Sequence, residues 1–255
     1  MSENLIMPRV KRTALITGSN KNIGRACALA LARSGCNIVV NGAKDSIAAE
    51  NVAREARALG VEALVAMGNV GKHEDATRIA EVALKSFGSV DILVNNAAVR
   101  ENKKFLEMTE EAWRYAMAVN FDSAYWLSRA CLPGMIEKHW GRIINFAGMG
   151  AINGYYGRCA HVCAAKHAAW GLTKALAKEF GATGITVNIV SPGPIVGEGH
   201  DPAVVAVHVA IMKARVPVGR VGTPDEVAAV VGLLASDAGA FVNGQMFQVN
   251  GGADT

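Results

Sequence analysis

The sequence has few aromatic residues, no long apolar run and no cluster of like charges. Phe, Trp and Tyr together make up 6% of its 255 residues. No apolar stretch reaches the ~18 residues that a membrane span needs, so we expect no membrane partner. The first residues, MSENLIMPRVKR, lack the apolar core of a secretory signal, and this favours a cytoplasmic location.

Lysine and arginine are scattered along the chain, and the formal net charge of +4 is mild. No basic run could follow a phosphate backbone, so we expect no nucleic-acid partner. The five cysteines contain no CxxC pair, which indicates reduced thiols. One short segment crowds four metal-ligand side chains, but their spacing is not a closed zinc pattern, so we expect no metal. These four are Cys159, His161, Cys163 and His167.

The sequence does contain a regular alternation of short β-branched runs and longer helical patterns. Hydrophobic residues make up 51%, mostly Ala, Val, Ile and Leu, as is typical of a parallel sheet covered on both faces. Strand, helix and strand repeated in this order predict right-handed crossover units, and therefore an α/β fold. The expected strands are 13–17, 37–41, 62–67, 91–95, 142–147, 186–190 and 245–249.

Local signals mark several expected helix ends. Four glycines stand where helices should stop, because glycine tolerates the left-handed conformation that follows a helix. Thr223, followed by Pro224 and by Glu226 three positions later, predicts a helix start with a capping box. The four glycines are Gly35, Gly60, Gly88 and Gly181.

The segment 194–222 has Gly and Pro at both ends and an amphipathic middle. This pattern favours a mobile flap over a substrate site. An ordinary surface helix with long connections is the alternative. The Val, Ala, Ile and Met side chains of the segment indicate a partly apolar small-molecule substrate.

A glycine-containing loop, TGSNKNIGR, joins the first expected strand to the first helix. Gly18 permits a tight turn, and Gly24 permits close packing of the helix. The helix then offers free N–H groups and the positive end of its dipole to a pyrophosphate. The strand–loop–helix context makes dinucleotide binding more specific than the glycines alone would.

About twenty residues further on, the sequence reads VVNGAK, where NAD-selective proteins often place an acid for the ribose hydroxyls. Asn41 is neutral there, and Lys21 and Lys44 could meet a 2′-phosphate. The cofactor is therefore expected to be NADP rather than NAD. Lysines that are merely solvated are the alternative.

Six motifs in order resemble those of the short-chain dehydrogenase/reductase family, and in particular its 3-oxoacyl-carrier-protein reductase branch. The resemblance covers nearly the whole length. It implies a single-domain, doubly wound Rossmann fold over 1–255 with a parallel sheet of about seven strands. It also implies a homotetramer, formed through the helices within 110–138 and 158–181. The motifs are TGSNKNIG, NNAA (95–98), MAVNF with Asn120, GRIINFAG, NIVSPGPI (188–195) and FVNGQMFQVNGG (241–252).

Transferred position by position, the resemblance gives a set of expected cofactor-binding residues. Three of its positions depart from the family pattern. Asn22 replaces the second loop glycine, Asn69 replaces the Asp that holds the adenine, and Gly197 replaces a Thr for the carboxamide. The expected residues are Gly18, Asn20, Lys21, Asn22, Ile23, Gly24, Asn41, Lys44, Asn69, Val70, Asn95, Ala97, Lys166, Pro192, Gly193 and Ile195.

The catalytic motif departs further. If Lys166 is the lysine of the family's YxxxK, Val162 stands where its tyrosine belongs. If GRIINFAG is the anchor instead, Gly148 takes the place of the catalytic serine and His161 that of the tyrosine. The two anchors differ by one residue, which indicates an insertion between them. There is no Ser between 129 and 190.

Several groups could replace the missing acid. The resemblance assigns Lys166 to the nicotinamide ribose and Asn120 to a water in the proton relay. His161 has an ordinary pKa suited to proton transfer. Tyr155 and Tyr156 precede the helix, where related enoyl reductases place their tyrosine, and Cys163 is a further alternative. The alternative for His161, Tyr155, Tyr156 and Cys163 is that the side chain only packs against its neighbours and takes no part in catalysis.

These residues leave three functions open. The first is NADP(H)-dependent oxidation or reduction of a small carbonyl, alcohol or conjugated C=C substrate with a non-standard proton donor. The second is a non-redox lyase, hydrolase or isomerase on the same scaffold. The third is a non-catalytic dinucleotide-binding protein. Hydride transfer, turnover without nicotinamide, and tight cofactor binding without turnover would distinguish them.

Overall fold

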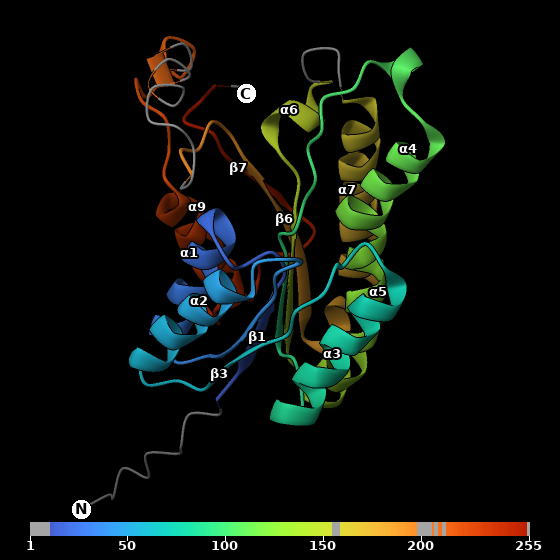
Figure 1. Cartoon of the computed structure of the whole chain (residues 1–255). Helices are drawn as coiled ribbons and strands as arrows, with labels where there is room; N and C mark the ends of the chain where they lie inside the picture. Colours follow the sequence, from blue (N-terminus) through green and yellow to red (C-terminus); the bar gives the residue numbers. More distant parts are fainter. Residues whose placement is uncertain (1–10, 155–158, 198–205, 207–208, 211–212, 254–255) are drawn as a thin grey trace, which may run out of the picture.

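A seven-stranded parallel sheet forms the centre of the molecule (Figure 1). The computed structural model describes residues 11–154, 159–197, 206, 209–210 and 213–253. The strand order is β3-β2-β1-β4-β5-β6-β7, so the winding direction reverses between β1 and β4. Such a switch point opens a crevice at the carboxyl ends of the strands. The strands are β1 Thr13–Ile16, β2 Asn37–Val40, β3 Ala63–Val65, β4 Ile92–Asn95, β5 Gly141–Phe146, β6 Ile185–Pro192 and β7 Met246–Val249.

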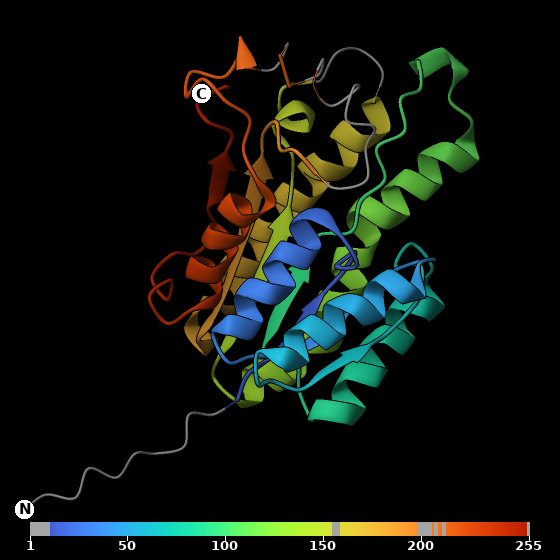
Figure 2. The same cartoon turned by 60° about the vertical axis from the view of Figure 1, so that its left-hand side comes forward.

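Helices cover both faces of this sheet, as the alternating sequence predicts. Helices α1, α2 and α9 lie on one face, and α3, α5 and α7 on the other (Figures 1 and 2). Successive residues of β1 divide between the layers, with Ile16 in the first core and Leu15 in the second. The helices are α1 Asn22–Arg33, α2 Ser46–Ala58, α3 His73–Phe87, α4 Glu110–Met117, α5 Ser123–Glu137, α6 Met149–Ile152, α7 Ala160–Phe180 and α9 Pro224–Ala235.

The predicted α/β Rossmann fold with seven parallel strands is thereby confirmed. The described residues also form three shorter helical turns: 3₁₀ turns at Phe105–Glu107 and Gly181–Thr183, and a π-helical turn, η2, at Ala118–Asp122. None of the helices in the described part of the chain has the length and apolarity to cross a bilayer.

Most of the helix-end signals are confirmed. Gly35, Gly60 and Gly88 have positive φ angles of 92°, 88° and 78°. Helix α7 ends immediately before Gly181, as predicted, but Gly181 has φ −56° and not the expected left-handed conformation. Helix α7 tightens into a 3₁₀ turn, and Gly184 takes the left-handed conformation three residues later, with φ 82°. A Cβ on Gly184 would lie 2.1 Å from the His139 carbonyl oxygen, so this position needs glycine.

The start of α9 is also as predicted. The Thr223 side chain accepts a hydrogen bond from the Glu226 N–H at 3.4 Å, and the Glu226 carboxylate accepts one from the Thr223 N–H at 2.9 Å. This reciprocal pair is the expected capping box.

The two ends of the expected 194–222 flap meet beside the end of β6. The Val196 N–H donates to the Gly222 carbonyl at 3.0 Å, and the Gly222 N–H donates to the Pro194 carbonyl at 2.9 Å. Residues 198–205, 207–208 and 211–212 of this segment lie outside the described residues. The flap therefore stays a prediction, rooted at the carboxyl end of the sheet.

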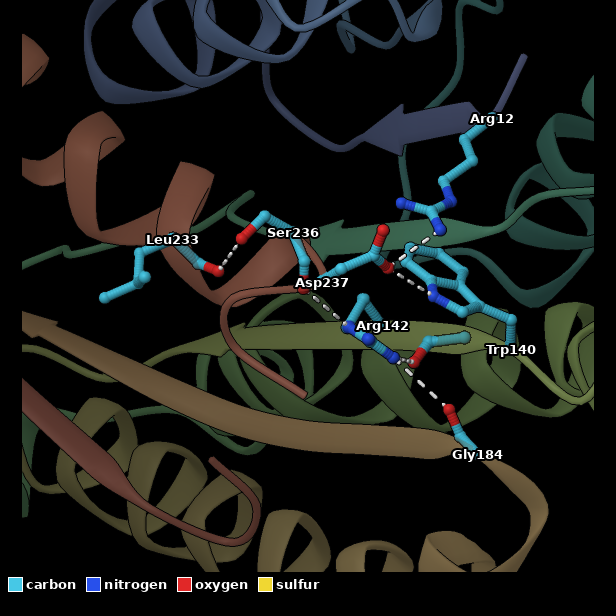
Figure 3. Close-up of polar contacts among 8 residues, drawn as sticks. Arg12, Trp140, Arg142, Gly184, Leu233, Ser236 and Asp237 are labelled. Carbon is cyan, nitrogen blue, oxygen red and sulfur yellow. Dashed lines mark hydrogen bonds and ion pairs between the residues drawn. The ribbon is translucent and has the colours of Figure 1, made fainter. Parts of the chain in front are cut away.

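A compact polar cluster joins the amino ends of the strands (Figure 3). The guanidinium carbons of Arg12 and Arg142 lie 3.6 and 4.2 Å from the centre of the Trp140 ring. Asp237 accepts hydrogen bonds from Arg12 at 2.8 Å and from the Trp140 indole at 3.0 Å. The buried Arg142 donates to three backbone carbonyls, those of Gly141, Gly184 and Ser236. These contacts tie the starts of β1, β5 and β6 to the end of α9.

Candidate functional site

A cleft of about 390 Å³ opens at the carboxyl ends of the strands, on the side where α6 lies in Figure 1. It is bounded by the loop after β1 and by the residues that follow β2, β3, β4 and β6. Of the expected cofactor residues, those that line it are Gly18, Asn20, Lys21, Asn22, Ile23, Gly24, Asn41, Asn69, Val70, Ala97, Pro192, Gly193 and Ile195.

The loop after β1 has the geometry of a phosphate site. Gly18 has φ 60°, and a Cβ on Gly24 would lie 2.3 Å from the Gly18 carbonyl oxygen. Lys21 precedes α1 without making a side-chain capping bond, so no side chain caps the start of that helix. A helix N-terminus at a cleft attracts negatively charged groups. These residues therefore fit the pyrophosphate of a dinucleotide.

Two of the departures from the family pattern lie against each other. Asn22 has φ 51°, the left-handed conformation that asparagine tolerates better than most residues. A Cβ on Gly197 would lie 2.6 Å from the Asn22 side-chain oxygen. The side chain gained at 22 thus occupies space that a side chain at 197 would need, so these two differences compensate each other.

The Asn41 side chain is buried, and its hydrogen bonds hold the cleft together. Its oxygen accepts from the Gly18 N–H at 3.1 Å, and its nitrogen donates to the carbonyls of Ala66 and Gly68 at 2.9 and 3.2 Å. A carboxylate here would face two carbonyl oxygens without a proton to donate.

The two candidate lysines differ in position. Lys21 is exposed and lines the cleft, whereas Lys44 is exposed and does not. Asn69 also keeps the cleft wall in shape, since its side-chain oxygen accepts from the Gly71 N–H at 3.0 Å. Lys21 is thus the better placed of the two lysines to meet an anion in the cleft.

A second cavity, of about 240 Å³, adjoins the cleft. The two share Arg100, Pro192 and Gly193 as lining residues. The second cavity is also lined by Lys166 and Val162 of α7 and by Gly148 at the end of β5. Lys166 and Val162, which the resemblance places at the family's lysine and, under one anchor, at its tyrosine, therefore share a cavity with Gly148, placed at its serine under the other anchor. This cavity lies next to a cleft that fits a dinucleotide.

Lys166 is 2% exposed and, within the described part of the chain, has no hydrogen-bond or ion-pair partner. Burial lowers the pKa of its ammonium group to about 7, and the nearby charge of Arg100 acts in the same direction. Arg100 was not among the residues that the sequence singled out. It follows NNAA by only two residues, and that proximity was the available signal.

His161 and Asn120 lie close to this cavity but do not line it. His161 is 2% exposed, its Nδ1 has no partner among the described residues, and burial lowers its pKa. Asn120, within the π-helical turn, accepts from the Val99 N–H at 3.3 Å and donates to the Val99 carbonyl at 3.0 Å. Asn120 thereby fixes the backbone that carries Arg100. Tyr155 and Tyr156 lie outside the described residues.

The two asparagines of the NNAA motif make different contacts. Asn95 donates to the Asn145 side chain at 2.8 Å, and Asn145 donates to Thr173 at 2.9 Å, so Asn95 braces the sheet against α7. Asn96, not Asn95, lines the cleft, and it donates to the carbonyls of Thr17 and Gly18.

The cysteines near the cavity form a pair. Cys159 lines the cavity, and its Sγ lies 3.9 Å from that of Cys163. Burial and the neighbouring Cys159 raise the pKa of the Cys163 thiol to about 11, which makes it a poor acid or nucleophile near neutral pH. No cluster of three or more His, Cys, Asp or Glu side chains within the described ranges is placed to hold a metal ion.

Comparison with known proteins gives a consistent family. The family model described as enoyl-(acyl carrier protein) reductase matches residues 18–254. A 3-oxoacyl-[acyl-carrier-protein] reductase from Synechocystis is 36% identical over 242 residues, which cover 94% of this chain and 96% of that protein. Its counterpart from Pseudomonas aeruginosa is 37% identical over 241 residues, with 94% and 96% covered.

A solved structure extends the likeness to the fold. Acetoin dehydrogenase from Salmonella typhimurium has a TM-score of 0.87 and 32% identity to this chain, and the match covers 95% of both. The sheet order, the loop after β1 and the lysine of α7 agree with this relationship. The chain therefore belongs to the short-chain dehydrogenase/reductase family.

Proposed function

We propose that this protein is an NADP(H)-dependent oxidoreductase acting on a small carbonyl or alcohol, or on a conjugated C=C bond. The observation that carries the proposal is the junction of the two cavities at Arg100, Pro192 and Gly193. When bound, the dinucleotide would supply or accept the hydride. The loop after β1 would hold its pyrophosphate, and Lys166 would hold the nicotinamide ribose and face the substrate.

The preference for NADP is supported by charge and by geometry. The Lys21 ammonium group lies at the cleft. The Asn41 side chain is hydrogen-bonded to backbone groups, and the carbonyl oxygen among them would repel a carboxylate at this position. A 2′-phosphate would gain a charge-assisted contact with Lys21, whereas a free 2′-hydroxyl would gain none from a carboxylate.

The proton donor would be non-standard. Val162 or His161 would stand at the family's tyrosine position, according to the anchor, and Gly148 at its serine position. Val162 and Gly148 line the cavity, and neither can donate a proton from its side chain. His161, Tyr155 and Tyr156 are the proposed replacements. His161→Phe should lower turnover by about 100-fold or more if His161 is the acid. Unchanged turnover in that variant would remove His161 from the set.

One observation favours a second candidate, a non-redox enzyme. A lysine with a pKa of about 7 is partly neutral at physiological pH, so its amine could act as a base or nucleophile without any nicotinamide. A lyase or isomerase could use such a group. A non-catalytic dinucleotide-binding protein is the remaining alternative, since the cleft alone would suffice for it.

Calorimetric titration of the purified protein with NADPH, NADH, NADP⁺ and NAD⁺ tests the proposal. We expect micromolar binding of NADPH, tighter than NADH, followed by hydride transfer to members of a ketone and enone panel. Lys21→Gln should reduce the NADPH preference, and Lys44→Gln serves as the matched control because Lys44 does not line the cleft. Absence of binding by all four nucleotides would refute the oxidoreductase proposal. Turnover without nicotinamide would support the second candidate.

A further inference from the structure

The cavity beside the cleft is lined by two cationic side chains and by no acid. Arg100 and Lys166 both line it, and none of its described lining residues is Asp or Glu. Neither cation has a hydrogen-bond or ion-pair partner within the described part of the chain. The neighbouring acid, Glu101, pairs instead with Lys103 at 3.3 Å. Lys166 is buried, whereas Arg100 is exposed, so the buried ammonium group in particular would gain from an anion that enters the cavity.

The start of helix α7 adds to the positive potential. This helix has 21 residues, and Cys159 at its N-cap makes no side-chain capping bond. Cys159 also lines the cavity, so the positive end of a long helix dipole lies at its wall. Asn102 lines it as well and can donate through its amide.

We propose that Arg100 and Lys166 bind a carboxylate of the substrate, so that the substrate is a small oxo acid or the corresponding hydroxy acid. This inference rests on the proposed oxidoreductase function. The planar guanidinium of Arg100 can hold a carboxylate through two parallel hydrogen bonds. The Lys166 ammonium has three donors, so it can contact a ribose hydroxyl and the carboxylate together. A volume of about 240 Å³ limits the ligand to a small molecule.

The backbone next to Arg100 is held by hydrogen bonds. Asn120 holds both the N–H and the carbonyl of Val99, the residue that precedes Arg100. Arg100 therefore lines both cavities from a backbone that Asn120 holds in place. Because Arg100 also lines the dinucleotide cleft, a cofactor phosphate is the competing ligand, and the test must separate the two.

The test compares carboxylates with their uncharged amides. The probes are 2-oxobutanoate, 3-oxobutanoate and 4-oxopentanoate, each beside its primary amide. Binding is measured by calorimetry without nucleotide, and reduction is measured with NADPH. At least one acid should bind about 10- to 100-fold more tightly than its amide, as is typical of hydrogen bonds to charged groups. The ratio of kcat/KM values should follow the same order.

Arg100→Met should bring the acid and amide within a few-fold of each other, without loss of NADPH affinity. Lys104→Met is the matched control, because Lys104 carries the same charge on the same segment, pairs with Glu107 and lines neither cavity. It should keep the preference for the acid. Circular dichroism and melting curves confirm that both variants are folded.

The outcomes are separable from those of the proposed function. A preference for acids that persists in a protein unable to bind NADPH would support the anion site and refute the oxidoreductase. Equal binding of acid and amide in all three pairs would overturn the inference. So would an Arg100→Met variant that loses NADPH affinity but keeps the acid preference, because Arg100 would then serve the cofactor.

Discussion

At the amino ends of the strands, Arg12 and Arg142 lie against the Trp140 ring, whereas at the carboxyl ends Arg100 and Lys166 share a cavity. The first pair is fully engaged: Arg142 donates to three carbonyls, and Arg12 donates to Asp237 (Figure 3). The second pair has no acceptor within the described part of the chain. Cations with acceptors stabilise the fold, and cations without them indicate a place for a ligand.

The pKa values of the two buried cations show the same contrast. Burial lowers the pKa of Arg142, but the nearby Asp237 opposes that shift. Burial lowers the pKa of Lys166 to about 7, and the charge of Arg100 adds to the shift. Burial is the larger cause for both groups, and the neighbouring charges differ: Asp237 favours the charged form of Arg142, whereas Arg100 disfavours that of Lys166. Among the described residues, the cations at the carboxyl end of the sheet lack the acceptors that the cations at the amino end have.

The largest effect is expected from Lys166→Met, which should change activity and stability in opposite directions. Turnover should fall by about 1,000-fold or more, because the side chain that faces both ribose and substrate is lost. Stability without nucleotide should rise by about 1–4 kcal/mol, as when an uncompensated buried charge gives way to an apolar side chain. Urea unfolding at constant protein concentration measures the second effect. Loss of stability would mean that Lys166 is a structural residue.

The effect of Lys166→Met on stability should also depend on pH. Folded Lys166 loses its proton near pH 7, whereas the unfolded chain keeps it up to its ordinary pKa of 10.5. Between these values the unfolded state binds more protons, so this group makes stability rise with pH by about 1.4 kcal/mol per unit. The advantage of Lys166→Met should therefore shrink between pH 7 and pH 10. A constant difference between the two urea midpoints across this range would contradict the lowered pKa.

Most of the fold could be predicted from the sequence, because each element carries a local signal. Apolar β-branched runs gave all seven strands, and the capping box at Thr223 marked the start of α9. The end of α7 at Gly181 was also predicted, but the left-handed residue is Gly184, three positions later. A Cβ there would lie 2.1 Å from the carbonyl oxygen of the distant His139, a contact that spacing along the chain does not reveal.

The candidate site was less predictable, because side-chain direction depends on tertiary contacts. The sequence placed Asn41 and Asn95 at the dinucleotide, but Asn41 turns its amide to backbone groups and Asn95 turns to Asn145. The one sequence signal for Arg100 was its place two residues after the NNAA motif. Its importance arises from the cavity that forms between the residues after β4 and helix α7. Such a cavity cannot be inferred from spacing along the chain.

A smaller effect, on stability alone, is expected from Arg142→Met at the amino end. Three buried carbonyls would lose a charged donor, and the Trp140 ring would lose one cation. We expect a loss of about 3 kcal/mol in the free energy of unfolding. NADPH affinity should be unchanged under conditions where the variant is folded. Arg54→Met is the control, because Arg54 is exposed and, among the described residues, hydrogen-bonds to the Asn51 side chain alone. It should change the free energy of unfolding by less than about 0.5 kcal/mol.

The smallest effect is expected from Asp237→Asn, although Asp237 contacts both Arg12 and Trp140. The two hydrogen bonds lower the pKa of its carboxyl group, with Arg12 the larger cause. Its side chain is 72% exposed and that of Arg12 30%, so solvent screens the pair and the loss should stay below about 1 kcal/mol.

Because the pKa of the Asp237 carboxyl group is lowered, its contribution to stability is present at neutral pH and is lost as the pH falls through the pKa of the folded state. It should also weaken in about 1 M salt, because this pair is exposed and the Debye length there is only ~3 Å. The loss caused by Arg142→Met should persist in the same salt, because its acceptors are buried carbonyls. If salt removed both losses equally, the amino-end cluster would be held by surface charge, and its contrast with the carboxyl end would fail.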